Sequence, residues 1–134
     1  MPNNLHLFKQ TGGDLFLNQI SISENFILKE FECNDGSHQV ALRHELLDKL
    51  QRLREEAGKP VIITSGYRNP SHNARVGGSP TSRHLTGEAA DIRIPGLHPD
   101  EVAQLAAAVG FTGIGIYDSF THVDIRPVPA RWRG

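Results

Sequence analysis

The sequence predicts an α+β domain in which a small, mainly antiparallel sheet packs against helices. Apolar residues recur at helical spacing between residues 39 and 57, which predicts an amphipathic helix. Short β-type segments at residues 61–64, 89–94 and 113–126 do not alternate with helices in a regular β-α-β order. The length of 134 residues suits one hydrophobic core, and no internal repeat is found. We therefore expect a single domain.

The N-terminal region, residues 1–22, is expected to form an extension or a hairpin ahead of the core. Its segments Leu5–Lys9 and Leu15–Asn18 flank a Thr-Gly-Gly-Asp turn signal and are typical of two short strands. Ser23 is then expected to cap a short helix that runs to about Phe31. An Asn-Asp-Gly turn follows this helix and leads toward the main one.

The main helix is expected to run from about Gln39 to Ala57, with leucines on one face and charged residues on the others. Gly58 supplies a left-handed stop and Pro60 prevents continuation, so residues 61–64 follow as a buried strand. The remaining elements are expected in this order: a long loop at residues 69–83 with one helical turn at residues 72–76, a strand at residues 89–94, a helix from Pro99 to Ala108 that ends at Gly110, and a hairpin of residues 113–117 and 121–126. Residues 23–126 then form the core and residues 127–134 a tail.

The composition excludes several classes of partner. A formal net charge of −1 provides no electrostatic basis for binding nucleic acid. No segment approaches the ~20 apolar residues of a membrane span, and the N-terminus lacks the pattern of a secretory signal. The single cysteine, Cys33, cannot form an intramolecular disulfide and is interpreted as a structural thiol. The fold must therefore depend on packing, with or without a bound metal.

Three side chains from separate segments form a candidate metal site. His84 and Asp91 lie seven residues apart on either side of Gly87, whose conformational freedom allows a sharp turn between them. His122 lies on the second strand of the predicted hairpin. Zinc binds imidazole nitrogen and carboxylate oxygen, and hydrolytic zinc sites combine three protein ligands with an open position for water. Two histidines and one aspartate meet that requirement.

Each of these residues alone has an ordinary structural explanation. They could be a loop histidine, a salt-bridged aspartate and a half-buried strand histidine. It is their combination that favours a metal site. The remaining histidines have no assigned role: His6, His38, His44, His72 and His98.

The pattern Ser-x-His-x-x-Gly-x-Ala-x-Asp at residues 82–91 resembles the zinc D-alanyl-D-alanine carboxypeptidase family. Ser-Gly-Tyr-Arg at residues 65–68 and His-Val-Asp at residues 122–124 extend the resemblance, which covers roughly Glu24 to Arg126. This family includes VanY-like enzymes and peptidoglycan-cleaving phage endopeptidases. It shares its fold with the hedgehog signalling domain and lysostaphin-type peptidases, so the resemblance implies a hedgehog/D-Ala-D-Ala peptidase-like fold.

The resemblance implies specific roles for the matching residues. It implies a Zn²⁺ ion bound by His84, Asp91 and His122. It also implies that Arg68 neutralises charge developing on the substrate carbonyl, and that Ser82 and Tyr67 contact the substrate. The alternatives are a structural ion pair for Arg68 and a loop hydrogen bond for Ser82.

The sequence departs from the family at the general base. The resemblance implies a Glu three residues before the last zinc ligand, or a His two or three residues before it. Ser119 and Phe120 occupy these positions, and neither accepts a proton near neutral pH. Asp124, on the same predicted strand face as His122, is the first candidate, either as the base or as a group that holds a ligand imidazole. Asp118 in the hairpin turn is the second candidate, if a bulge turns it inward.

The resemblance implies a zinc metallopeptidase that cleaves a peptidoglycan stem peptide or muropeptide next to D-alanine, as a carboxypeptidase or as an endopeptidase. Because the usual base is missing, the alternative is a non-catalytic, zinc-stabilised domain that binds cell wall or another ligand. A metal-free structural domain would require the histidines to be incidental. We expect a monomer without a membrane span, either cytoplasmic or released in the manner of a phage lysin.

Overall fold

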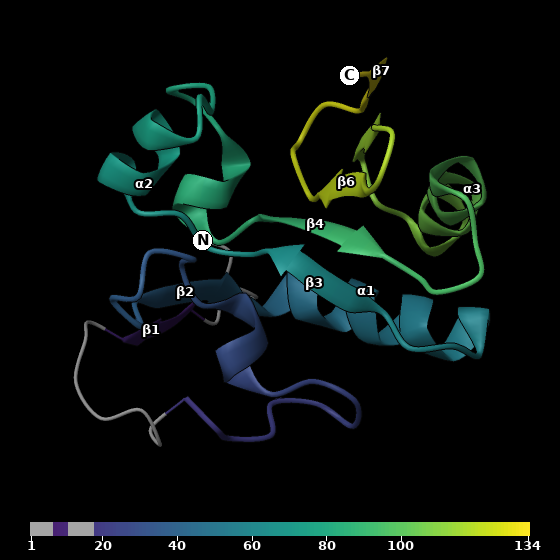
Figure 1. The fold of residues 1–134 in the computed structure, drawn as a ribbon. Helices are drawn as coiled ribbons and strands as arrows, with labels where there is room; N and C mark the ends of the chain where they lie inside the picture. Colours follow the sequence, from purple (N-terminus) through teal and green to yellow (C-terminus); the bar gives the residue numbers. More distant parts are fainter. Residues whose placement is uncertain (1–6, 11–17) are drawn as a thin grey trace.

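The fold is built around a five-stranded sheet, as Figure 1 shows. This computed structural model describes the backbone of residues 7–10 and all of residues 18–134. The strands of the sheet are, in spatial order, β3 (Ile62–Ser65), β4 (Ala89–Arg93), β6 (Thr121–Asp124), β5 (Gly113–Ile116) and β7 (Ala130–Arg133). Neighbouring strands are antiparallel except for β5 and β7, which are parallel. The predicted α+β class with a mainly antiparallel sheet is confirmed.

One hydrophobic core joins two α-helices to the sheet. The helices α1 (His44–Ala57) and α3 (Pro99–Val109) contact each other, and α3 also contacts β5 and β6. Alternate strand residues complete the core, among them Ile92, Ile114 and Val123. Burying each such side chain contributes about 1.5–3 kcal/mol to folding. Side chains alternate along a strand, so on each strand the residues next to these core positions point to the opposite face of the sheet, which is polar.

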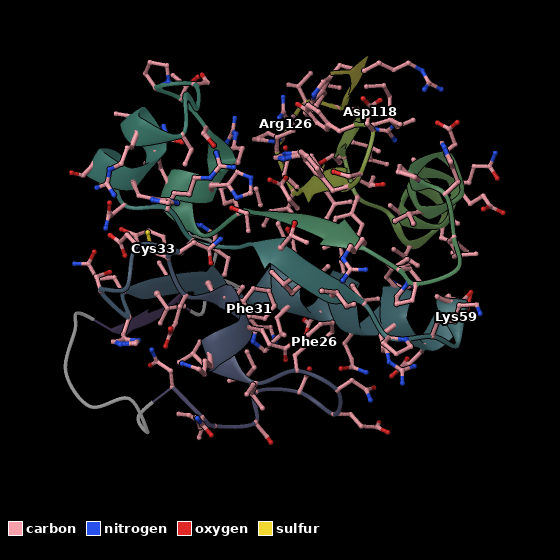
Figure 2. All side chains as sticks on the ribbon, viewed as in Figure 1. Phe26, Phe31, Cys33, Lys59, Asp118 and Arg126 are labelled. Carbon is pink, nitrogen blue, oxygen red and sulfur yellow. The ribbon has the colours of Figure 1, made fainter. Side chains whose placement is uncertain are left out.

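Short elements extend this core and border the polar face. The 3₁₀ turn η1 (Leu28–Phe31) carries Phe31, whose ring lies 5.9 Å from that of Phe26 beneath β3 (Figure 2). The short helix α2 (Pro70–Arg75) and the 3₁₀ helix η2 (Arg83–Thr86) lie near the N-terminal end of β4 (Figure 1). The loop predicted at residues 69–83 thus contains α2 near the predicted helical turn, and η2 begins where the loop ends.

The predicted ends of the main helices are confirmed. Gly58 follows α1 with φ of 64° and Gly110 follows α3 with φ of 99°, the left-handed conformation that glycine adopts at helix ends. The predicted strands and the final hairpin correspond to β3, β4 and the β5–β6 pair. Within the described residues, no helix has the length and apolar character needed to cross a bilayer.

Strand β2 (Val40–Arg43) replaces the predicted first turn of the main helix. It pairs with β1 (Leu7–Gln10), whereas we expected β1 to pair with residues 15–18, most of which lie outside the described part of the chain. The N–H of Arg43 also donates to the carbonyl of Gly87 at 3.0 Å. Hydrogen bonds to distant segments thus override the helical spacing of these residues.

The structure also differs from the prediction at the start of the core and in the C-terminal tail. The helix expected from Ser23 is shortened to η1, and the Ser23 hydroxyl donates to the side-chain carbonyl of Gln51 on α1 at 2.7 Å instead of capping a helix. The predicted tail at residues 127–134 contains β7, which is hydrogen-bonded along β5 at the edge of the sheet. The C-terminal residues are therefore part of the fold.

Candidate functional site

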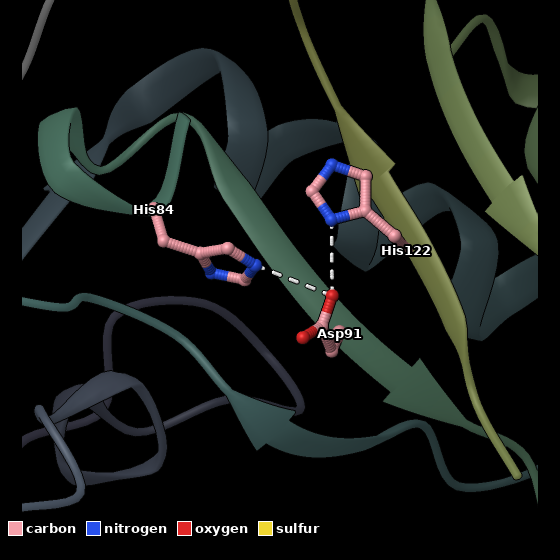
Figure 3. Close-up of side chains that lie close together, drawn as sticks. All are labelled: His84, Asp91 and His122. Atoms are coloured by element: carbon pink, nitrogen blue, oxygen red, sulfur yellow. Dashed lines mark hydrogen bonds and ion pairs between the residues drawn. The ribbon is translucent and has the colours of Figure 1, made fainter. Parts of the chain in front are cut away.

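Three buried side chains converge on the polar face of the sheet: His84, Asp91 and His122. Figure 3 shows both imidazoles directed at the same carboxylate oxygen. Nε2 of His84 lies 3.2 Å and Nδ1 of His122 lies 3.0 Å from Oδ1 of Asp91. One ligand atom from each residue lies within 4.8 Å of the others. The structure therefore brings together the three residues that the sequence predicts as metal ligands.

This donor set fits a tetrahedral metal ion. Ligand atoms bound ~2.1 Å from a tetrahedral zinc ion lie roughly 3.4 Å from one another, close to the two separations observed. The outward ring nitrogens already have partners. Nδ1–H of His84 donates to the carbonyl of Gly66 at 2.8 Å, and Nε2–H of His122 donates to the carboxylate of Asp124 at 2.8 Å. These bonds fix the orientation of both rings and leave the inward nitrogens for a metal.

Strand register and one glycine position these ligands. Asp91 on β4 lies directly opposite His122 on β6. His84 comes from η2, which Gly87 ends with φ of 73°. A Cβ at Gly87 would also lie 2.7 Å from the backbone of β2. Only glycine meets both demands, so the sharp turn predicted between His84 and Asp91 is confirmed.

Burial and hydrogen bonding set the charge of the cluster. Burial raises the pKa of Asp91, but hydrogen bonds from His122 and His84 outweigh it and hold the pKa of this carboxyl well below its usual range. Burial lowers the pKa of His122, but hydrogen bonds to Asp124 and Asp91 outweigh it, so this pKa lies above the ordinary value. Asp91 is therefore an anion near neutral pH and presents its charge to a cation.

Asp124 lies behind His122, on the nitrogen that faces away from Asp91. Its side chain is fully buried and also accepts hydrogen bonds from the backbone and the guanidinium of Arg126, the closest at 2.6 Å. Burial raises the pKa of Asp124, but the hydrogen bonds from His122 and from Arg126 outweigh burial and lower this pKa. Gly113, opposite it on β5, leaves the space, since a Cβ there would overlap the carboxylate. This geometry favours holding a ligand imidazole over acting as a base.

Arg68 reaches the cluster from the segment after β3. Its guanidinium donates to Oδ2 of Asp91 at 3.3 Å, to the hydroxyl of Ser65 at 3.2 Å and to the side chain of Asn73 on α2 at 3.3 Å. The structural ion pair considered for Arg68 is thus present, and the same guanidinium lines the cavity described next. Arg68 can therefore steady Asp91 and meet a ligand at the same time.

A cavity of about 610 Å³ lies over the cluster, a size typical of small-molecule sites. One wall comes from residues 76–79 and 81–83, most of which are glycine, serine or threonine. The other wall is aromatic and contains Tyr117, Phe120 and Trp132. Ser82, the predicted substrate contact, lines the cavity, and its hydroxyl accepts the backbone N–H of His84 in η2 at 3.2 Å. The Ser82 hydroxyl thus makes the loop hydrogen bond that was considered as the alternative to a substrate contact.

Two of the predicted site residues lie elsewhere. Tyr67 is not a residue of the cavity wall; it interacts electrostatically with Cys33, and burial raises the pKa of both side chains, as expected for a structural thiol. Asp118 is exposed at the tip of the β5–β6 hairpin (Figure 2), whose strands pair without the bulge that would turn it inward. Within the described part of the chain, Asp91 is the sole carboxylate of the cavity wall.

The cavity-wall residues that sequence reasoning missed include Tyr117, Arg126 and Trp132. The sequence did contain one signal for a site at this face: Gly113 and Gly115 in β5 are two residues apart and so lie on the same face of the sheet. Glycine inside a strand often marks a place where other groups approach the backbone closely. Both glycines do so here, with a site residue packed over each of them.

The sequence is similar to known proteins over much of its length. The sequence profile of the Peptidase M15 family matches residues 22–125. The zinc D-Ala-D-Ala carboxypeptidase of Streptomyces albus G is 40% identical over 67 residues, which cover 49% of this chain and 26% of that protein. The peptidoglycan L,D-endopeptidase MepK of Escherichia coli K12 is 28% identical over 93% of this chain and 75% of its own length. The match thus spans about a quarter of the first relative and three quarters of the second.

Proposed function

The chain belongs to the Peptidase M15 family, and we propose that it is a zinc-dependent peptidase that hydrolyses peptidoglycan stem peptides at a bond next to D-alanine. The names of the relatives support this proposal, one being a zinc D-Ala-D-Ala carboxypeptidase and the other a peptidoglycan L,D-endopeptidase. These names differ in the bond that is cut. The proposal therefore includes both removal of a terminal D-alanine and cleavage within the peptide.

The observation that carries this proposal is the convergence of three ligand atoms at the wall of one cavity. Zn²⁺ would be held by Nε2 of His84, a carboxylate oxygen of Asp91 and Nδ1 of His122. When bound, zinc supplies a Lewis acid that polarises a carbonyl and lowers the pKa of water. Three protein ligands leave a coordination position open, as hydrolytic zinc sites require.

The surrounding side chains have roles that follow from their contacts. Asp124 keeps the His122 imidazole in the orientation that directs Nδ1 inward. The Arg68 guanidinium, whose side chain is 16% exposed, lies beside Asp91 and can donate to a peptide carbonyl oxygen as negative charge develops on it. Ser82 also lines the cavity, where its hydroxyl can contact the substrate.

Metal analysis tests the site independently of activity. The purified protein is expected to contain one zinc ion per chain. The variants His84→Ala and His122→Ala each remove one ligand and are expected to lose the metal, whereas His98→Ala, at the exposed start of α3, serves as the matched control. Unchanged zinc content in both ligand variants would overturn the proposed metal site.

Product analysis tests the reaction and identifies the bond. The protein is incubated with muramyl pentapeptide and with cross-linked muropeptides, and the products are measured by mass spectrometry. Loss of one terminal alanine indicates a carboxypeptidase, and separation of cross-linked chains indicates an endopeptidase. A chelator should abolish either product and added zinc should restore it. Zinc-loaded protein that forms neither product would rule out the peptidase.

A zinc-stabilised binding domain is the second candidate function, and one observation favours it. Among the described residues, the cavity wall offers no carboxylate besides Asp91, so no separate carboxylate base lies there. A binding domain needs the metal and the cavity but not a base. Calorimetry would then detect muropeptide binding to the zinc-loaded protein, with the ligand recovered intact. Recovery of cleaved ligand would exclude this alternative.

A further inference from the structure

We propose that Trp132, in the C-terminal strand β7, is a positioning residue for the metal site, holding both the His122 imidazole and the Arg126 guanidinium in place. This inference rests on the proposed metal site and not on the peptidase reaction. Strand β7 lies beyond residues 22–125, the part of the chain that the family profile matches. The proposal therefore assigns a function to the end of the chain.

A row of four residues in register connects β7 to the metal ligands. Asp91 on β4 lies opposite His122 on β6, His122 lies opposite Gly115 on β5, and Gly115 lies opposite Trp132 on β7. Residues directly opposite one another on adjacent strands share a face of the sheet. All four positions therefore belong to the polar face that carries the cavity.

The missing side chain of Gly115 allows Trp132 to reach His122. Adjacent strands lie ~4.8 Å apart, so two intervals separate the backbones of β7 and β6 by about 10 Å. The ring centroids of Trp132 and His122 are nevertheless only 5.2 Å apart. A Cβ at Gly115 would overlap the Nε1 and Cε2 atoms of the indole. The indole therefore occupies the space that a side chain at position 115 would fill.

Three contacts fix the indole. Its ring packs against the His122 imidazole at an interplanar angle of 47°, and the Arg126 guanidinium lies over it, 4.8 Å from the ring centroid. Its Nε1–H donates to the hydroxyl of Tyr117 at 2.9 Å. Arg126 in turn holds Asp124, which bonds to the far nitrogen of His122. The imidazole is thus bracketed by the indole and the Asp124–Arg126 pair, and removing the indole loosens both.

Competition with a chromophoric chelator for Zn²⁺ tests this role. Trp132→Ala is expected to weaken Zn²⁺ binding 10–100-fold, the usual effect of removing a group that orients a metal ligand, and Trp132→Phe should restore most of the affinity. Gly115→Ala displaces the indole and should weaken binding by a similar factor. The double variant Gly115→Ala, Trp132→Ala should bind no more weakly than either single variant, because both remove one contact.

Arg131→Ala is the matched control in the same strand. Arg131 is exposed, next to Trp132, and donates to the backbone carbonyl of Thr112. Successive strand residues point to opposite faces, so its removal disturbs β7 without reaching His122. This variant should keep the affinity of the wild-type protein for Zn²⁺.

Fluorescence provides a readout that a purely structural role would not change. Trp132 is the single tryptophan of the chain, so its emission reports directly on the surroundings of His122. Zn²⁺ should change this emission in the wild-type protein, and the change should be smaller in Gly115→Ala. Wild-type affinity in either Gly115→Ala or folded Trp132→Ala would overturn the positioning role. A wild-type protein that binds no Zn²⁺ would instead overturn the metal site itself.

Discussion

Replacing Asp124 by asparagine separates two roles for this buried carboxylate, a support for His122 and a general base. The amide has almost the same shape, so the space left by Gly113 stays filled. It still accepts a hydrogen bond from Nε2–H of His122 but carries no charge. Hydrogen bonds to charged groups contribute roughly 1.5–3 kcal/mol and neutral ones about 0.5–1.5 kcal/mol. About 1 kcal/mol or more is therefore lost at the contact to His122.

The two roles predict opposite results. If Asp124 holds His122, Asp124→Asn should weaken Zn²⁺ binding 10–100-fold, which equals about 1.4–2.7 kcal/mol, because removing the support for a metal ligand has effects of this size. Excess zinc should then restore most of the turnover. If Asp124 is instead the base, Zn²⁺ affinity should change little, and turnover should fall ~10²–10⁴-fold at every zinc concentration.

The assay combines chelator competition with turnover measured across zinc concentrations. Asp118→Asn is the matched control, because it makes the same chemical change at an exposed carboxylate of the hairpin turn. This control should match the wild-type protein in both measurements. Wild-type Zn²⁺ affinity in Asp124→Asn would refute the reasoning from the 2.8 Å contact to His122.

Three further changes test other parts of the structure. Arg68→Ala should lower kcat at saturating zinc ~10²–10³-fold, as removal of an oxyanion donor does; an unchanged kcat would limit Arg68 to its ion pair. Hydrogen bonds from Ser37 lower the pKa of Asp35 from its ordinary 3.8, so their stabilisation is complete above pH 3.8 and is lost as the pH falls through the lower folded-state pKa. Acid unfolding of Asp35→Asn should lack that loss, and a curve identical to wild type would contradict it. Leu50→Ala, at a fully buried core position, should lower the free energy of unfolding by about 2–5 kcal/mol in denaturant titrations, and a loss under 1 kcal/mol would contradict the packing.

The sequence by itself determined the features that depend on near neighbours. Helical spacing predicts α1, and Gly58 and Gly110 end the two long helices because glycine readily adopts the left-handed conformation. The ligand pair His84 and Asp91 is recognisable because both residues lie within one ten-residue pattern around Gly87. These signals are local, so no knowledge of the folded chain is needed to read them.

Only the tertiary structure decided which distant residues meet. It turned residues 40–43 into a strand by pairing them with β1, it placed Asp124 behind His122, and it left Asp118 exposed at the predicted turn without the bulge that would direct it inward. It also brought Trp132 across β5 to the ligands. Contacts between neighbouring strands depend on register and on the space that glycines leave, and spacing along the chain specifies neither of them.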